Sequence, residues 1–494
     1  MIALLLFAAL SPVHERYDTA FAARAVGMVS EVIRFPTVAG NEGARAAEKE
    51  WLFRTAASLG LTARDADTMT EIELPGPAGA PVLGLVVHGD VQPVDEKAWT
   101  VPPFAGVVRD GHVWGRGAAD DKGPLVQALL SMAALKDKGP QRTHTIRLLV
   151  GSDEESGSSD VREYLNSHAP PDYTLVLDSA FPVTIGEKAW DGLTVSTDIG
   201  ERAADKRWSV ASAEAGLAPS IVPDRARLVL RWRDGEPRWS ELVQRLVSKT
   251  PPVGTRLEIT ARGDELEVLA QGRAAHAGVN LAGGRNALVA LARAVEGELP
   301  SSGADDLLAF VRLVGRDLHG TALGLPQDRW GGYDVNVATL GTHTSLAPAE
   351  DGKLTLVINL RRPPPLTGPQ ARERLFAAVA DFARKRGARL RPGGYFQDEP
   401  LAFDPQAKIV RRLMMAYRRA TGQDDPPAIS GGGTYAKRLP RSIAFGMWFP
   451  GKPYPGHDTD EQLPIADLHR GAHVLIETLL DIACGEPLRD PFTP

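Results

Sequence analysis

The stretch TIRLLVGSDEESG, residues 145–157, joins an apolar run to three consecutive carboxylates. The run 145–150 is short and rich in aliphatic and β-branched residues, which is typical of a buried strand. Asp153, Glu154 and Glu155 follow directly where that strand ends. Like charges so close together repel one another, so the arrangement predicts a source of positive charge nearby.

The segments around this strand alternate between the strand and helix patterns. Further strand-like runs lie at 81–88, 173–178 and 442–448, and helix-like runs at 20–35, 43–59, 124–136, 159–167, 406–422 and 465–484. Strands that alternate with helices are typical of layered α/β domains. We therefore predict an α/β fold whose catalytic domain has a mostly parallel sheet flanked by helices.

The middle of the chain has a different texture. Strand-like runs with alternating apolar residues occur at 225–233, 256–263, 265–272 and 353–362, with helical runs at 284–297 and 368–386. A chain of 494 residues is also too long for one hydrophobic core, because cores stop growing near ~250–300 residues. We predict an inserted α+β domain at 194–395 and a first domain made of 1–193 and 396–494.

Composition excludes several classes of protein. The net charge of −6 and the absence of a basic stripe with interleaved aromatics argue against a nucleic-acid partner. The single cysteine, Cys484, allows neither a disulfide nor a cysteine zinc site within the chain, so any metal must use His, Asp and Glu. The apolar run 1–10 is shorter than the roughly 20 residues that span a bilayer. We favour an export signal to the periplasm, with a buried first helix in a cytoplasmic protein as the alternative.

Polar side chains also follow the other strands of the predicted sheet. His88 and Asp90 end the run 81–88, and Asp178 ends the run 173–178. Ligands of open α/β sheets bind beyond the carboxyl ends of the strands. We therefore expect these residues to meet the carboxylates of 153–155 at one rim.

Two loops add further candidate ligands. Asp120 and Asp121 lie in the glycine-rich turn WGRGAADDKGP (114–124), and His457 lies in PYPGHDTDE (453–461). Histidine nitrogen and carboxylate oxygen together suit zinc or manganese. Each feature alone has an ordinary structural interpretation, such as a helix N-cap for Asp-Asp. Their occurrence at successive strand ends favours a metal site.

Eight motifs in this order resemble the dinuclear zinc exopeptidases, the family of the carnosinases, carboxypeptidase G, succinyl-diaminopimelate desuccinylase and, closest in pattern, bacterial dipeptidase V. The motifs are HGDVQPV (88–94), GRGAADDKGP (115–124), GSDEESGS (151–158), LDSAFPVTIGEK (177–188), RAAHAG (273–278), INLRRP (358–363), SGGGTYAKRLP (430–440) and PGHDTDE (455–461). The resemblance covers nearly the whole chain after residue 20.

The resemblance implies two divalent metal ions, most simply Zn²⁺, with Mn²⁺ or Co²⁺ as alternatives. Asp120 would bridge both ions. His88 and Asp178 would complete one site, and Glu155 and His457 the other. The positive charge that the clustered carboxylates require would come from these ions.

The resemblance also implies the catalytic groups. Glu154 would be the acid/base for a water that bridges the metals, Asp90 would orient His88, and His276 in the inserted lid domain would stabilise the oxyanion. The residues that would bind substrate are Arg361, Ser220 and Gly432. Ser220 departs from the asparagine that the family's dipeptidases commonly carry in the motif APSIVPD (218–224), which puts the oxyanion contact and the dipeptide preference in doubt.

The function implied is metal-dependent hydrolysis of small dipeptides with a free C-terminal carboxylate. Alternatives are an N-acyl amino acid amidohydrolase or deacylase, a carboxypeptidase of the same family, and a non-catalytic metal-binding scaffold. A lid of about 200 residues, 194–395, would close the site within one chain, so we expect a monomer, with a homodimer as the alternative.

Overall fold

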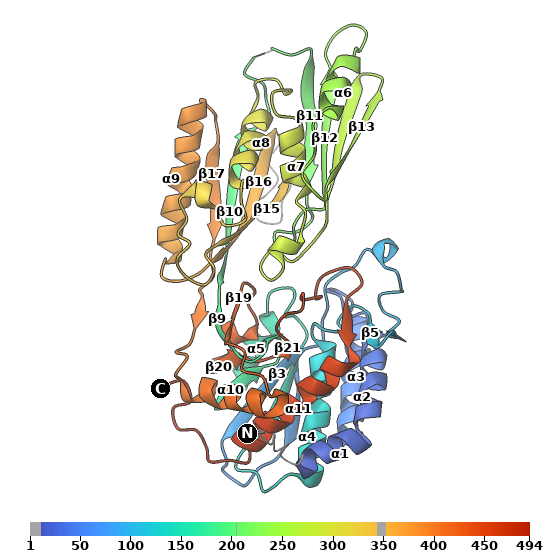
Figure 1. Cartoon of the computed structure of the whole chain (residues 1–494), viewed down its shortest axis with the longest axis vertical. Coiled ribbons are helices and arrows are strands. Elements are labelled where there is room, and N and C mark those ends of the chain that lie inside the picture. Colours follow the sequence, from blue (N-terminus) through green and yellow to red (C-terminus); the bar gives the residue numbers. More distant parts are fainter. Residues whose placement is uncertain (1–10, 204, 343–351) are drawn as a thin grey trace, which may run out of the picture. The chain divides into compact units, whose positions relative to one another are not determined.

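The computed structural model describes residues 11–203, 205–342 and 352–494, which fall into two compact units (Figure 1). The first unit combines residues up to Gly186 with those from Leu401 onward, and the second runs from Glu187 to Pro400. The apolar run 1–10, the basis of the predicted export signal, lies outside the described residues. None of the helices in the described ranges has the length and apolar character needed to span a bilayer.

A six-stranded sheet forms the centre of the first unit, in the order β1-β2-β6-β3-β7-β20. Strands β6, β3, β7 and β20 run parallel, and β2 and β1 add an antiparallel edge, which confirms the predicted mostly parallel sheet. The strands are β1 (Thr62–Ala66), β2 (Met69–Leu74), β3 (Val82–His88), β6 (Thr145–Gly151), β7 (Tyr173–Val176) and β20 (Ser442–Ala444).

Helices pack against this sheet and against each other. They are α1 (Pro12–Ala20), α2 (Ala22–Ile33), α3 (Glu42–Ser58), α4 (Lys122–Lys138), α5 (Ser159–Ser167), α10 (Lys408–Thr421) and α11 (Ile465–Ile482). Helix α4 contacts β3 and β6 as well as α1, α2 and α11. Its residues 122–135 are all buried, so its sequence is apolar all round instead of carrying a single apolar stripe.

The register of the central strands decides where their polar ends lie. His88 at the end of β3 pairs with Gly151 at the end of β6, and Val86 pairs with Val176 at the end of β7. Because these strands are parallel, the residues that follow them leave from the same edge of the sheet.

Short ribbons complete the first unit. They are β4 (Val107–Arg109) with β5 (His112–Trp114) and β22 (Gln462–Pro464), β8 (Ser179–Ala180) with β21 (Met447–Trp448), and β9 (Thr184–Glu187) with β18 (Leu401–Ala402) and β19 (Ala428–Ser430). The antiparallel pairing of β22 with β5 brings the loop before residue 462 to the turn that follows residue 114.

The second unit is an eight-stranded antiparallel sheet with helices. Its strands, in spatial order, are β13 (Arg256–Arg262), β14 (Glu265–Gln271), β12 (Arg225–Trp232), β11 (Trp208–Ala215), β15 (Asp334–Gly341), β16 (Lys353–Arg362), β10 (Ala189–Asp198) and β17 (Arg391–Phe396). Its helices are α6 (Ser240–Val247), α7 (Ala287–Ala294), α8 (Gly303–Val314) and α9 (Gly368–Arg386). Single 3₁₀ turns occur in the two units at Glu96–Ala98, Leu281–Gly283, Thr321–Leu323 and Tyr435–Lys437.

Strand β16 separates two neighbouring arginines onto opposite faces of this sheet. Ile358 and Leu360 belong to the core cluster that also contains residues of α7, α8 and α9. Arg362 points to the same side, where its Nε donates to Asp191 Oδ2 at 2.7 Å and both side chains are almost completely buried. Since side chains alternate along a strand, Arg361 points to the other face.

We predict that Asp191→Asn destabilises the protein, because it leaves the buried guanidinium of Arg362 without its counter-charge. Breaking a buried ion pair from one side costs about 3–5 kcal/mol of unfolding free energy. Urea unfolding measures this loss. The matched control is Asp381→Asn, which removes an exposed carboxylate paired with Lys385 on α9 and should barely move the urea midpoint. Equal losses in both variants would contradict the assignment.

Candidate metal centre

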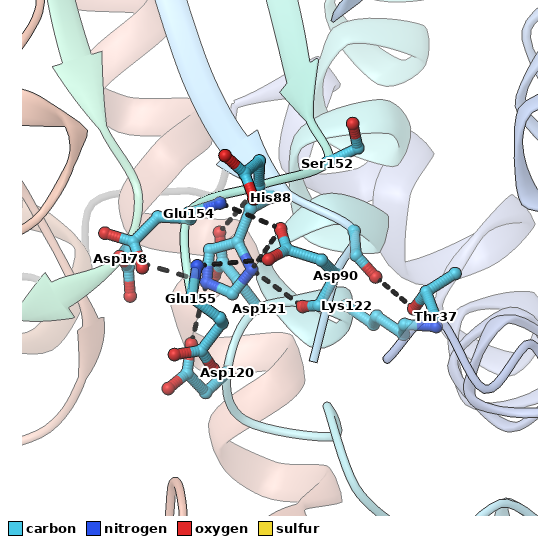
Figure 2. A network of polar contacts seen from close by, with 12 residues as sticks. Thr37, His88, Asp90, Asp120, Asp121, Lys122, Ser152, Glu154, Glu155 and Asp178 are labelled. Atoms are coloured by element: carbon cyan, nitrogen blue, oxygen red, sulfur yellow. Dashed lines mark hydrogen bonds and ion pairs between the residues drawn. The ribbon is translucent and has the colours of Figure 1, made fainter. Parts of the chain in front are cut away.

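The structure brings the five predicted metal ligands together in the first unit. His88 Nε2 lies 2.8 Å from Asp120 Oδ1 and 4.0 Å from Asp178 Oδ2. His457 Nε2 lies 3.1 Å from Asp120 Oδ2 and 2.9 Å from Glu155 Oε2. Asp120 therefore stands between the two histidines, although residues 88 and 457 are far apart in the sequence. Figure 2 shows His88, Asp120, Glu155 and Asp178 gathered at this point.

The donor atoms have the spacing that a metal ion requires. Atoms of His88, Asp120 and Glu155 all lie within 4.8 Å of one another, and so do atoms of His88, Glu154 and Asp178. Imidazole nitrogen with carboxylate oxygen is a donor set that zinc and manganese accept. The cluster thus has the donors for a divalent metal ion, and His88 belongs to both groups.

The electrostatics of the cluster point the same way. Burial raises the pKa of Glu154 well above its usual range, and the charges of Glu155 and Asp120 raise it further. Burial also raises the pKa of Asp178, again helped by Asp120. Burial lowers the pKa of His88, but the hydrogen bond and charge of Asp120 outweigh it and raise that pKa well above its usual range. Buried anions in this number need cations, and divalent ions satisfy that need.

Asp90 holds two parts of the cluster at once. Its Oδ1 accepts from Glu154 N at 3.1 Å and its Oδ2 from Glu155 N at 3.0 Å, which fixes the loop after β6 (Figure 2). His88 Nδ1 lies 2.9 Å from the carbonyl oxygen of Asp90 and 3.6 Å from its carboxylate. Asp90 therefore orients the histidine mainly through its backbone, and its carboxylate serves the two glutamates.

Asp153 does not join the cluster, which corrects the expectation that all three consecutive carboxylates meet at the rim. Its Oδ2 accepts from Ser159 N at 2.9 Å and from Ser159 Oγ at 2.6 Å, at the start of α5. The free backbone N–H groups of a helix start are strong donors, and they bind the first acid of the run. The neighbouring acids Glu154 and Glu155 remain at the metal centre.

Glu461 is a site residue that the sequence analysis missed. It is completely buried, and its Oε1 accepts from Ala119 N at 2.9 Å and Asp120 N at 3.1 Å. Its Oε2 accepts from Arg116 Nη1 at 2.8 Å and Gly117 N at 3.2 Å. One carboxylate thus fixes the turn that carries Asp120. The signal was its position at the end of the motif PGHDTDE.

Three more supporting residues were not predicted to have a role. Gln92 Nε2 donates to Glu155 Oε2 at 2.9 Å. Asp121 Oδ2 accepts from His88 N at 3.1 Å. Lys122 is completely buried and pairs with Glu48 Oε1 at 3.0 Å, at the start of α4. The contacts of Gln92 and Asp121 help to hold Glu155 and His88 in place.

Two predicted residues of the second unit lie side by side. Ser220 O accepts from Ala277 N at 2.8 Å, directly beside His276. His276 Nδ1 accepts from Gly278 N at 3.1 Å and Val279 N at 2.9 Å. A ring nitrogen that accepts two N–H groups carries no proton itself, so the neutral imidazole has its proton on Nε2.

The remaining predicted residues are Arg361 in the second unit and Gly432 in the first. Arg361 is only 5% exposed and lies on the face of the second unit's sheet opposite Arg362. Burial lowers the pKa of Arg361 to about 10, and the negative charge of Asp334 is the largest of the effects that raise it. Gly432 lies in a turn of the first unit, where its N–H donates to Ser430 Oγ at 3.0 Å.

Comparison with known proteins identifies the family of the chain. Residues 84–481 match the model of peptidase family M20/M25/M40. The chain is 26% identical to the putative dipeptidase YtjP of Bacillus subtilis over 408 residues, which cover 82% of this chain and 84% of the relative. It is also 26% identical to the Beta-Ala-Xaa dipeptidase of Lactobacillus delbrueckii over 419 residues, 83% of this chain and 84% of that enzyme.

Solved structures share the fold. Human carnosine dipeptidase 1 superposes with a TM-score of 0.58 at 14% identity, over 95% of this chain and 97% of that chain. The di-peptidase Dug1p of Saccharomyces cerevisiae gives a TM-score of 0.57 at 14% identity, with the same coverage. At this identity these likenesses bear on the fold alone, whereas the family match rests on the sequence. The chain therefore belongs to peptidase family M20/M25/M40 and is a hydrolase of the peptidase class.

Proposed function

We propose that this protein is a metal-dependent dipeptidase that hydrolyses the amide bond of small dipeptides with a free C-terminal carboxylate. The observation that carries the proposal is the buried cluster in which Asp120 lies between His88 and His457 with Glu154 beside it. The names of two relatives, a putative dipeptidase and a Beta-Ala-Xaa dipeptidase, support dipeptides as the substrate class.

Two divalent ions would be held by the five clustered residues. Asp120 would bridge them, His88 and Asp178 would complete one site, and Glu155 and His457 the other. Zn²⁺ is the simplest choice for this donor set, with Mn²⁺ and Co²⁺ as alternatives. When bound, such ions supply Lewis acidity, which polarises a carbonyl group and makes water a nucleophile near neutral pH.

The residues of the chain handle protons and orientation. Glu154 accepts the proton of the attacking water and delivers it to the leaving amine. Asp90 keeps Glu154 in place because its Oδ1 accepts a hydrogen bond from the backbone N–H of Glu154 at 3.1 Å. His276, with its proton on Nε2, donates to the oxyanion that develops on the carbonyl oxygen. The planar guanidinium of Arg361 binds the substrate's carboxylate.

A substrate panel tests the proposal directly. We expect hydrolysis of L-alanyl-L-alanine and β-alanyl-L-alanine and little activity on N-acetyl-L-alanine, measured by release of free alanine. The reason is that a dipeptide offers the free carboxylate together with a small amine-bearing acyl part. Faster hydrolysis of the N-acetyl compound would replace the proposal with an amidohydrolase of N-acyl amino acids.

We predict that Glu154→Gln lowers kcat by about 10²–10⁴-fold, because the amide cannot accept the proton of water. Metal content, measured by elemental analysis of the purified protein, should stay at the wild-type level. The matched control is the neighbouring acid, Asp153→Asn, which caps α5 and should keep near wild-type turnover. A fully active Glu154→Gln enzyme would rule out the acid/base role.

Removal of metal should abolish activity, because the clustered donors then have no Lewis acid to position. We expect dialysis against a strong chelator to inactivate the enzyme and addition of Zn²⁺, Mn²⁺ or Co²⁺ to restore it. Activity and metal content are measured on the same samples. Undiminished hydrolysis by metal-free protein would contradict the mechanism.

A further inference from the structure

Three buried polar side chains on one face of the second unit's sheet lack hydrogen-bond partners among the described residues. They are Asn359, through both Nδ2 and Oδ1, Arg361, through Nε, and Trp190, through Nε1. Asn359 and Arg361 are two positions apart on β16, so they share a face, and Trp190 on β10 stands directly opposite Arg361. This is the face opposite to the core with α7, α8 and α9, into which Ile358 and Leu360 point.

Buried polar groups without partners are rare in native proteins, because losing water without gaining a hydrogen bond costs free energy. Asn359 is completely buried and Arg361 is 5% exposed. No carboxylate of the described residues forms an ion pair with Arg361, because its neighbour in register, Asp334, is bound by Lys188 Nζ at 2.6 Å. Asn359 Nδ2, Arg361 Nε and Trp190 Nε1 are all hydrogen-bond donors, and Arg361 is positively charged, so an anion is the ligand that suits them.

The next polar residue on this face is satisfied and connects the patch to His276. Asn336 on β15 stands in register with Asn359. Its Nδ2 donates to Ile221 O at 3.0 Å, and its Oδ1 accepts from Asn286 Nδ2 at 3.1 Å. Ile221 in turn forms a β-bridge with His276. Asn336 therefore links the unpartnered groups, through Ile221, to the segment that carries the proposed oxyanion donor.

We propose that Asn359 is a further substrate-binding residue, which acts with Arg361 to bind the C-terminal residue of the dipeptide. Asn359 Nδ2 and Arg361 donate to the carboxylate oxygens of that residue. Same-face neighbours on a strand stand about 7 Å apart, a gap that these two side chains close on a small ligand. This inference rests on the proposed dipeptidase function and adds a residue that sets substrate specificity.

The test compares kinetics on L-alanyl-L-alanine and on its C-terminal amide. For Asn359→Leu we expect KM for the free dipeptide to rise about tenfold or more with kcat little changed, because a hydrogen bond to a charged group is lost. KM for the amide should stay within about twofold, since that substrate has no carboxylate to bind. Asn359→Asp, which repels a carboxylate, should raise KM for the free dipeptide further.

Tyr333→Phe is the matched control. It removes a buried hydroxyl that also lacks a partner among the described residues, but Tyr333 lies in the core on the helix side of the sheet. We expect both KM values to stay at the wild-type level. Replacing a buried polar group without partners by an apolar one of similar size is close to neutral for stability, so Asn359→Leu should unfold at a temperature near that of wild type.

The outcomes separate the two proposals. If wild-type protein hydrolyses the dipeptide and both folded Asn359 variants keep its KM, the role of Asn359 is wrong and the dipeptidase function stands. Equal KM increases on the dipeptide and the amide would also contradict the proposed role of Asn359, because they would indicate a packing defect. If wild-type protein hydrolyses no dipeptide, both proposals fall together.

Discussion

The candidate metal centre depends on one carboxylate that contacts two histidines far apart in the sequence. Asp120 presents one oxygen to His88 at 2.8 Å and the other to His457 at 3.1 Å. That arrangement requires the carboxyl edge of the parallel sheet, the turn before α4 and a loop near the C-terminus to meet at one point. The antiparallel pairing of β22 with β5 and the four donors bound by Glu461 make this meeting specific.

Much of the fold could be predicted from the sequence where local pattern and tertiary environment agree. Alternation predicted the strand 353–362, and the periodicity of 368–386 predicted α9, whose capping box at Thr367 and left-handed Gly387 mark its ends. Boundaries were less certain where packing overrides local pattern. The run 20–35 was predicted as one helix. In the structure α1 ends at Ala20 and α2 spans Ala22–Ile33, so the predicted helix is two residues too long at each end.

The candidate site was predictable where ligands follow strands, since strand direction alone sends His88, the carboxylates after β6 and Asp178 to one edge. Residues that act through backbone groups were not predictable. Glu461 binds mostly main-chain N–H groups, and those leave no mark in the sequence. Asp153 was wrongly expected at the rim because the sequence does not distinguish three consecutive acids. Only the structure shows that Asp153 accepts a hydrogen bond from Ser159 N at the start of α5. Asn359 stands out only through its missing partners.

The link between Glu461 and the turn at 116–120 has a consequence for how the enzyme is made. A ribosome completes β3, α4 and β6 long before residue 461 emerges, and until then Arg116 and the amides of the turn lack their acceptor. A polypeptide released early by a stalled ribosome therefore has neither His457 nor the carboxylate that shapes the turn. We therefore expect incomplete translation products to be inactive, because the candidate metal centre is assembled only when the C-terminal segment with His457 and Glu461 is present.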